Sequence, residues 1–151
     1  MEEHVFQVDL NWQKDRLGVI SSPDLKQLIE VATPPQFSQG IEHIWSPEHL
    51  FTAAVNSCFM TTFLAIAENS RLDFVGFTCS AKGKLEQENG RFLMTEILLE
   101  PVLTIANESD IEKAERILQK SEKACLISNS IHSKISMTTK IVINNSVLKS
   151  Y

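Results

Sequence analysis

The residues of this chain with the most distinctive chemistry are its three cysteines. Cys58, Cys79 and Cys125 are scattered through 151 residues, without a C-x-x-C pair and in too small a number for a disulfide-stapled secreted scaffold. A thiol is reactive where a positive group holds its thiolate in a shielded but reachable pocket, and inert where it packs as a small hydrophobe. The role of each cysteine therefore depends on the element that positions it.

The overall composition excludes several classes of partner. The net charge of −5, from 14 basic and 19 acidic residues, provides no basic stripe for nucleic acid. We expect no membrane partner, since no apolar run approaches the ~20 residues of a membrane helix and the N-terminus lacks signal-peptide features. We therefore expect a soluble cytoplasmic protein. We also expect no metal site, because the histidines lack metal-ligand spacing: His4, His43, His49 and His132.

The N-terminal third is predicted to be a set of short strands. Apolar and polar residues alternate over residues 4–12, which is typical of a half-buried strand. Pro34 and Pro35 then remove two backbone donors and stop regular pairing. We expect strands at residues 4–12, 18–22 and 28–33, a turn over residues 14–18 and a loop over residues 34–45.

A long helix is predicted to follow this loop. Ser46 is suited to cap it, Pro47 suits the first helical position, and Glu48 faces the positive end of the helix dipole. We expect the helix to run to about Ser70. Its interior is apolar nearly all round, which predicts a helix buried on most sides.

A hairpin, a second helix and a strand complete the predicted order. Glu112 stands three residues after Ser109, which indicates a capping box at the start of the second helix. The order of strands, helix, hairpin, helix and strand predicts an α+β fold in a single domain over residues 1–151. The hairpin strands are expected at residues 74–85 and 92–105 around the turn 88–90, and the last strand over residues 135–143.

These elements place the three thiols on apolar faces. Cys79 falls on the apolar face of a hairpin strand, and we interpret it as core. Cys58 lies inside the long helix and Cys125 ends the apolar stripe of the second, so that periodicity leaves both a structural and a redox role open for each. Arg16 and Glu48 are charged candidates to support a thiolate. Each also has an ordinary explanation, Arg16 as a solvated arginine in a turn and Glu48 as a first-turn carboxylate that favours the helix dipole.

The segment SPEHLFTAAVNSCF resembles the signature of the OsmC/Ohr family of organic hydroperoxide reductases. In that family a Pro-Glu-x-Leu helix start is followed, ten positions after the Glu, by a peroxidatic Cys, and a second Cys ends a later helix. Glu48 and Cys58 are ten apart here, and Cys125 ends the later helix. The similarity covers the order of elements from about residue 5 to residue 145. It implies antiparallel sheets packed around two main helices in an intertwined homodimer.

Two positions depart from the family pattern. Many members have Pro after the second Cys, where this chain has Leu126. The family's arginine comes from the first turn, which matches Arg16, or from a later strand, where this chain has Gln36. The resemblance therefore assigns Arg16 as thiolate stabiliser and Glu48 as the residue that orients it. Ten residues place Glu48 about 15 Å along the helix from Cys58, so a bridging arginine or a second subunit would have to join them.

The resemblance also implies a mechanism. The Cys58 thiolate would attack an organic hydroperoxide, and Cys125 would resolve the resulting sulfenic acid as a disulfide. No bound cofactor is implied. An external dithiol, for which the family suggests a lipoylated protein, would then reduce the disulfide. Phe51, Phe59 and Phe37 are expected either to favour alkyl hydroperoxides or to be plain core.

Three other functions stay open at this stage. One is an OsmC-like dimer that binds a small apolar ligand and has little peroxidase activity. Another is a general thiol–disulfide oxidoreductase, which the lack of a C-x-x-C pair disfavours. The third is a purely structural homodimer.

Overall fold

The computed structural model of the protein describes residues 1–144. The chain forms two compact units, Met1–Leu50 and Phe51–Tyr151, the second of which is described as far as residue 144. The predicted single domain over residues 1–151 extends past the described residues and stays a prediction.

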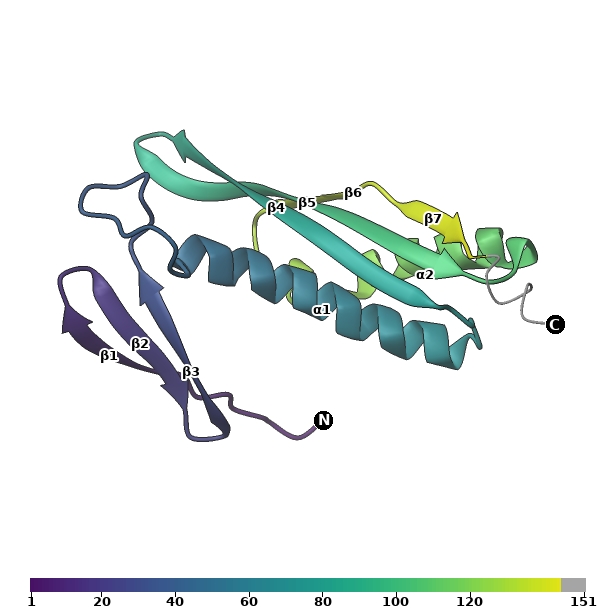
Figure 1. The fold of residues 1–151 in the computed structure, drawn as a ribbon, viewed down its shortest axis with the longest axis horizontal. Helices are drawn as coiled ribbons and strands as arrows, with labels where there is room; N and C mark the ends of the chain where they lie inside the picture. Colours follow the sequence, from purple (N-terminus) through teal and green to yellow (C-terminus); the bar gives the residue numbers. More distant parts are fainter. Residues whose placement is uncertain (145–151) are drawn as a thin grey trace. The chain divides into compact units, whose positions relative to one another are not determined.

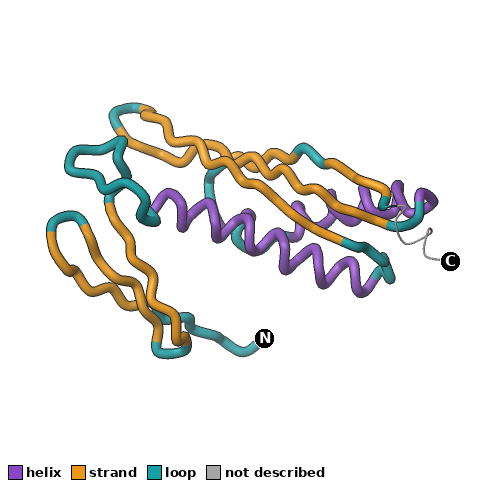
Figure 2. The backbone as a smooth tube through the Cα atoms, viewed as in Figure 1, coloured by secondary structure: helices purple, strands orange, loops and turns teal. Residues whose placement is uncertain are grey.

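The first unit contains a three-stranded antiparallel sheet in which the strands pair in chain order (Figure 2). Its strands are β1 (Asp9–Lys14), β2 (Leu17–Ser22) and β3 (Leu25–Ala32). Asp15 makes the turn between β1 and β2 with a positive φ of 47°, and its carbonyl accepts the Trp12 Nε1–H at 3.0 Å. The second predicted strand is confirmed, whereas the third begins three residues earlier than predicted.

The first strand is shorter and more exposed than the alternation of residues 4–12 predicts. The first pair is Asp9 with Ser21, and β1 begins at Asp9, so residues 4–8 of the predicted strand lie outside it. All six residues of β1 are exposed, and the Trp12 side chain is 71% exposed. The predicted half-burial is therefore wrong for the described chain.

The loop after β3 is closed by its own backbone. The Phe37 N–H donates to the Pro34 carbonyl at 3.0 Å, and the Ile41 N–H donates to the Thr33 carbonyl at 2.9 Å. A Cβ at Gly40 would collide with the Pro34 carbonyl, so this close approach requires glycine. The predicted loop is confirmed, and it leads directly into the first helix.

Helix α1 (Pro47–Asn69) begins as predicted. The Oγ of the buried Ser46 accepts the His49 N–H at 3.2 Å, which is the N-cap hydrogen bond. Pro47 is the first helical residue, and Glu48 lies in the first turn. Local sequence signals therefore position the start of the helix that carries Cys58.

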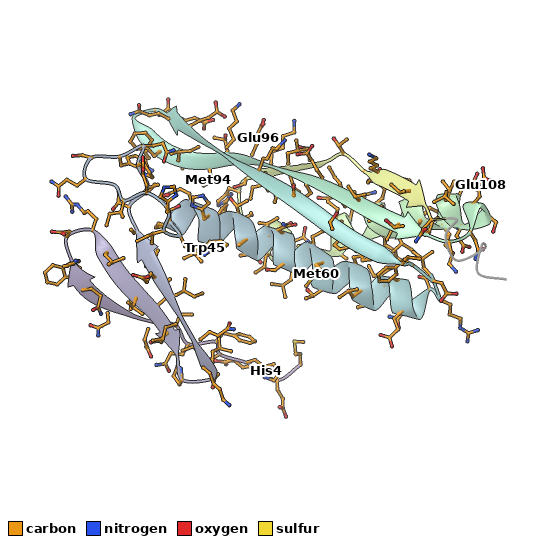
Figure 3. The ribbon with its side chains drawn as sticks, in the orientation of Figure 1. His4, Trp45, Met60, Met94, Glu96 and Glu108 are labelled. Carbon is orange, nitrogen blue, oxygen red and sulfur yellow. The ribbon has the colours of Figure 1, made fainter. Side chains whose placement is uncertain are left out.

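Helix α1 buries one stripe rather than most of its surface. Its buried residues recur at intervals of four: Val55, Phe59, Phe63 and Ala67. Met60 and Leu64 are 40% and 42% exposed, and Met60 is labelled in Figure 3. The prediction of a helix buried on most sides is wrong for the described chain, because the elements that form the core contact one stripe.

The length and composition of α1 also correct the expectation about membrane helices. An 18-residue window of α1 has a mean hydropathy of 1.7, so the helix is long and apolar enough to cross a membrane by these criteria alone. The core helix of a soluble protein meets the same criteria. Because the buried stripe of α1 belongs to the core of the second unit, we interpret α1 as such a helix.

The predicted hairpin is confirmed as two long antiparallel strands that run along α1 (Figure 1). The strands are β4 (Gly76–Glu88) and β5 (Arg91–Ile105). Asn89 and Gly90 connect them with φ values of 49° and 77°, and two positive values are the mark of a type I′ turn. Phe63 of α1 stacks on Phe77 of β4 with ring centroids 4.6 Å apart.

The rest of this sheet is parallel to β5, so the sheet is mixed rather than antiparallel as predicted. The two added strands are β6 (Lys134–Met137) and β7 (Lys140–Ile143), and both pair with β5. The chain returns from β5 to β6 through a helix, which is the crossover that parallel pairing needs. The predicted strand over residues 135–143 is interrupted at Thr139, whose Oγ1 donates to the Glu115 carboxylate at 2.9 Å.

The second helix starts differently from its predicted capping box. A 3₁₀ turn, η1 (Glu108–Asp110), runs directly into α2 (Ile111–Ala124), so Ser109 lies inside helical backbone. Asp110 is the N-cap residue, and its side chain makes no capping hydrogen bond. The inward stripe of α2 consists of these buried residues: Ala114, Ile117, Leu118 and Ser121.

Candidate functional site

The structure brings together Cys58 and Cys125, which lie 67 residues apart in sequence (125 − 58). Cys58 is half-buried in the middle of α1, and Cys125 is fully buried directly after the last residue of α2. Each thiol shifts the pKa of the other, which places the two side chains next to each other. The second unit alone therefore assembles the thiol pair.

The surroundings of Cys58 favour its thiolate. Burial raises the pKa of the Cys58 thiol, but four hydrogen bonds outweigh it and leave the pKa below its ordinary value of 9.0. The donors are the backbone N–H of Ile127, the Cys125 thiol, the Thr62 hydroxyl and the backbone N–H of Leu126. Cys58 is consequently the member of the pair that is poised to act as a nucleophile.

The other two thiols are held in the neutral form. Burial raises the pKa of Cys125, and the adjoining Cys58 raises it further, because a second negative charge beside the first is unfavourable. Burial also raises the pKa of Cys79 to about 11. Cys79 packs against the core of the second unit, as the sequence predicted.

A compact turn after α2 positions Cys125 and the backbone donors. Cys125 is extended, with φ −63° and ψ 117°, and the short 3₁₀ helix η2 (Ser128–Ser130) follows it. The Asn129 N–H donates to the Cys125 carbonyl at 3.1 Å, and the Ser130 Oγ donates to the Leu126 carbonyl at 2.8 Å. Leu126 and Ile127, whose backbone groups help to lower the pKa of Cys58, belong to this turn.

Arg16 and Glu48, the charged residues predicted for the site, belong to the first unit. Arg16 is exposed in the turn between β1 and β2, and its carbonyl accepts the Thr33 N–H at 3.4 Å. Glu48 is half-buried in the first turn of α1. Their approach to the Cys58 thiolate stays a prediction. Gln36, the alternative position for the family's arginine, is exposed in the loop after β3.

A largely apolar groove lies within the second unit. Phe51 lines it and stands seven residues before Cys58, which puts both on one face of α1. Ser130, at the end of the turn that carries Cys125, also lines it. The groove has a volume of ≈ 590 Å³, and its other lining residues include Phe92, Leu93, Met94, Ile131, His132 and Lys134.

The comparison with known protein families decides the identity of the fold. The family model of the OsmC-like proteins matches residues 40–140, which is more than half of the chain. The chain belongs to the OsmC-like family. The matched segment includes both cysteines of the pair.

Relatives of this OsmC-like protein agree with that assignment. YmaD, an uncharacterized protein of Bacillus subtilis (strain 168), is 25% identical over 142 residues, which cover 91% of this chain and 93% of the relative. An OsmC-like protein of unknown function from Vibrio cholerae superposes with a TM-score of 0.81 and 21% identity, covering 91% of this chain and 99% of the other. An organic hydroperoxide resistance protein from Elizabethkingia anophelis gives a TM-score of 0.75 and 23% identity, covering 95% and 99%. The α+β fold predicted for this OsmC-like protein is confirmed.

Three of the groups that lower the pKa of Cys58 in this OsmC-like protein were not predicted from sequence. Thr62 lies four residues after Cys58, so helical spacing alone would have placed it on the same face. The backbone donors of Leu126 and Ile127 have no side-chain signature and depend on the turn that brings them to α1. Phe59, considered as a substrate contact or as core, is core with no exposed surface.

Proposed function

We propose that this OsmC-like protein is a thiol-dependent peroxidase that reduces organic hydroperoxides to alcohols. The Cys58 thiolate attacks the terminal peroxide oxygen, the O–O bond breaks, and the alcohol leaves with a proton while Cys58 becomes a sulfenic acid. The Cys125 thiol then displaces water from that sulfenic acid to form the Cys58–Cys125 disulfide. One hydroperoxide and two thiols thus yield one alcohol, one water and one disulfide.

One observation carries this proposal: the two thiols adjoin each other, and their pKa values are shifted in opposite directions. The pKa of Cys58 is lowered by its hydrogen bonds, and that of Cys125 is raised by burial and by Cys58. A nucleophile that ionises early beside a thiol that stays protonated is the arrangement that a two-step peroxidase needs. A purely structural pair of core cysteines has no requirement for this difference.

The apolar groove of the second unit supports an organic substrate. Its aromatic and aliphatic walls, including Phe51, Phe92 and Ile131, suit the carbon substituent of a hydroperoxide. Hydrogen peroxide would gain nothing from such walls. The groove therefore supports alkyl or aryl hydroperoxides as the substrate class.

The same proposal includes Arg16, Glu48 and a second subunit. Arg16 would stabilise the thiolate and orient the peroxide, and Glu48 would hold the guanidinium by a charge-assisted pair. A homodimer is supported by the exposed apolar residues of the first unit, each at least 67% exposed: Val5, Phe6, Val8, Leu10, Trp12, Leu25 and Leu28. Light scattering of the purified protein would test the dimer directly.

Turnover in this scheme needs an external dithiol, for which we propose a lipoylated protein. No metal or organic cofactor takes part, because sulfur itself accepts the oxygen. A cytoplasmic location fits this scheme, since a disulfide that has to be reduced in every cycle requires a reducing compartment.

Thiol titration before and after one equivalent of cumene hydroperoxide tests the proposal. The reduced protein has three free thiols, and the reaction should leave one. Cys58→Ser should lose no thiols. Cys125→Ser should lose one thiol and form a sulfenic acid that dimedone traps. Cys79→Ser is the matched control and should lose two thiols as the wild type does.

Rate constants separate this function from the rival ones. If wild-type thiols are consumed no faster than free cysteine, or if Cys58→Ser loses as many thiols as the wild type, the peroxidase proposal is wrong. Rapid reduction of insulin disulfides without peroxide selectivity would indicate a general thiol–disulfide oxidoreductase instead.

A further inference from the structure

We propose that Met94 is a further peroxide-reactive sulfur of this protein, a thioether that an organic hydroperoxide held in the apolar groove oxidises to methionine sulfoxide. Met94 lines that groove. The inference rests on the proposed function, from which it takes the substrate class, and it adds a modification site to the groove wall. Cys58 takes no part in this reaction, so the two sulfurs can be tested separately.

The hydroxyl groups in the groove wall donate their hydrogens within the protein. Thr95, Ser130 and Ser133 contribute these hydroxyls. Their acceptors are the Glu86 carboxylate, the Leu126 carbonyl and the Met94 carbonyl, at 2.5, 2.8 and 2.5 Å. The hydrocarbon and sulfur atoms of the wall are therefore left to hold the carbon part of a ligand, which favours an apolar hydroperoxide over hydrogen peroxide.

Met94 is fixed in the groove wall by its backbone and by its side chain. It pairs with Leu85 across the β4–β5 hairpin, and its carbonyl accepts the Ser133 hydroxyl. A Cβ at Gly83 would come within 2.6 Å of the Met94 Cε and would also collide with the Thr52 side chain of α1. Gly83 thus leaves room for the end of the Met94 side chain, and Figure 3 labels Met94 in this part of the hairpin.

A thioether in this position can react with the proposed ligand of the groove. Its sulfur attacks the terminal peroxide oxygen, the O–O bond breaks, and the proton of the hydroperoxide passes to the departing alkoxide, which leaves as the alcohol. One thioether and one hydroperoxide thus give one sulfoxide and one alcohol. The sulfoxide is polar, so the reaction turns an apolar part of the wall into a hydrogen-bond acceptor.

Two other methionines provide internal controls. Met60 of α1 is 40% exposed, whereas Met94 is half-buried, so exposure alone gives Met94 no advantage over Met60. Met137 of β6 is half-buried like Met94, but it packs against the core of the second unit. Preferential oxidation of Met94 would therefore have to come from binding of the oxidant in the groove.

Oxidation of the full-length Cys58→Ser protein by two oxidants tests the proposal. Cumene hydroperoxide or hydrogen peroxide is added, and mass spectrometry follows the sulfoxide fraction of each methionine with time. The ratio of the Met94 rate to the Met60 rate cancels the intrinsic reactivity of the oxidant. We expect this ratio to be about tenfold higher with cumene hydroperoxide, which is the enrichment expected from burying most of one aromatic ring. The ratio of Met137 to Met60 should be the same with both oxidants.

A competitor and a groove variant provide independent arms. Excess cumyl alcohol, which carries the same ring but no peroxide bond, should slow the oxidation of Met94 by cumene hydroperoxide and leave that of Met60 unchanged. Phe92 lines the groove and is 58% exposed, so Phe92→Ala should fold and should lower the ratio of Met94 to Met60. The matched control is Val75→Ala, which removes a 51% exposed side chain just before β4, at the opposite end of the hairpin, and should keep the ratio.

The outcomes separate this site from the proposed peroxidase. A ratio of Met94 to Met60 that is equal for the two oxidants, or that cumyl alcohol leaves unchanged, would overturn the Met94 site. Selective oxidation of Met94 in a protein whose wild type loses no thiols to cumene hydroperoxide would support the Met94 site and overturn the peroxidase. Loss of two thiols in the wild type together with equal ratios would overturn the Met94 site alone.

Discussion

Limited alkylation of the reduced wild-type protein at pH 7 should modify Cys58 long before Cys79. Both residues are half-buried, and the difference expected here comes from ionisation. Burial raises the pKa of Cys79 to about 11, whereas hydrogen bonds overcome burial at Cys58 and lower its pKa from 9.0. Cys125, fully buried and with a raised pKa, should also react more slowly than Cys58.

The size of this difference follows from the pKa values. A thiol with a pKa of 9.0 is about 1% thiolate at pH 7, so Cys58 exceeds that fraction. Cys79, at a pKa of about 11, is about 0.01% thiolate. The more basic thiolate is more nucleophilic by about 6–10-fold over two pKa units, which offsets part of the roughly hundredfold difference in ionisation. The rate constant of Cys58 should therefore exceed that of Cys79 by at least about tenfold.

Mass spectrometry after substoichiometric iodoacetamide measures this ratio on the intact protein. The control is the same reaction on the unfolded protein in about 6 M guanidinium chloride, a concentration well above the unfolding midpoints of most small proteins. The three cysteines should then react at similar rates. Cys79 reacting as fast as Cys58 in the folded protein would refute the reasoning, since the hydrogen bonds to the Cys58 sulfur would then have no effect on its ionisation.

Three further predictions concern the second unit. Asn56 Nδ2 donates to the carbonyl of Cys79 at 2.9 Å, and the residue opposite Cys79 on β5 is Pro101, which has no N–H. Asn56→Ala should therefore lower the free energy of unfolding, measured in urea, by about 1–2 kcal/mol. An unchanged free energy of unfolding, equal to that of the exposed control Ser57→Ala, would contradict this prediction. The neutral Cys79 thiol stabilises the fold fully below pH 9, and this stabilisation is lost as the pH rises through about 11. Between pH 8 and 11 the free energy of unfolding of the wild type should therefore fall by about 1–2 kcal/mol more than that of Cys79→Ala. Parallel pH profiles of the two proteins would refute this prediction. A Cβ at Gly83 would collide with the side chains of Thr52 and Met94, so Gly83→Ala should lower the free energy of unfolding, measured by thermal unfolding, by about 1–3 kcal/mol. Gly76→Ala is the control and should have a much smaller effect, because a Cβ there would make only ordinary contacts. Equal effects of the two substitutions would contradict this description of the packing.

Features that depend on a few adjacent residues could be predicted from the sequence. Ser46 caps α1 through a hydrogen bond to His49, only three residues further along the chain. Asn89 and Gly90 form a turn with positive φ values, which asparagine and glycine adopt readily. The predicted capping box at Ser109 rests on an equally local signal, yet this prediction was wrong. The 3₁₀ turn at Glu108–Asp110 extends the helical backbone toward the N-terminus, and this leaves Ser109 no end to cap.

Features that depend on pairing between distant segments were less predictable. The alternation over residues 135–143 indicated a strand but carried no information on its partner, and the parallel pairing with β5 follows from the crossover through α2. The candidate site divides in the same way. The family resemblance, carried by the spacing from Glu48 to Cys58, identified Cys58 and Cys125. The backbone groups of Leu126 and Ile127 could be recognised only once the structure of the turn after α2 was known.

The two incorrect predictions of burial both overestimated it. The alternation in β1 predicted a half-buried strand, and the apolar surface of α1 predicted a helix buried on most sides. In the structure β1 is exposed throughout, and Met60 and Leu64 of α1 are 40% and 42% exposed. The apolar pattern of a sequence reflects every side chain that is buried in the functional assembly. The exposed fractions of the described residues are those of a single chain. A shared excess of apolar surface is therefore what the proposed homodimer requires, because its interface would cover side chains that a single copy leaves open to water.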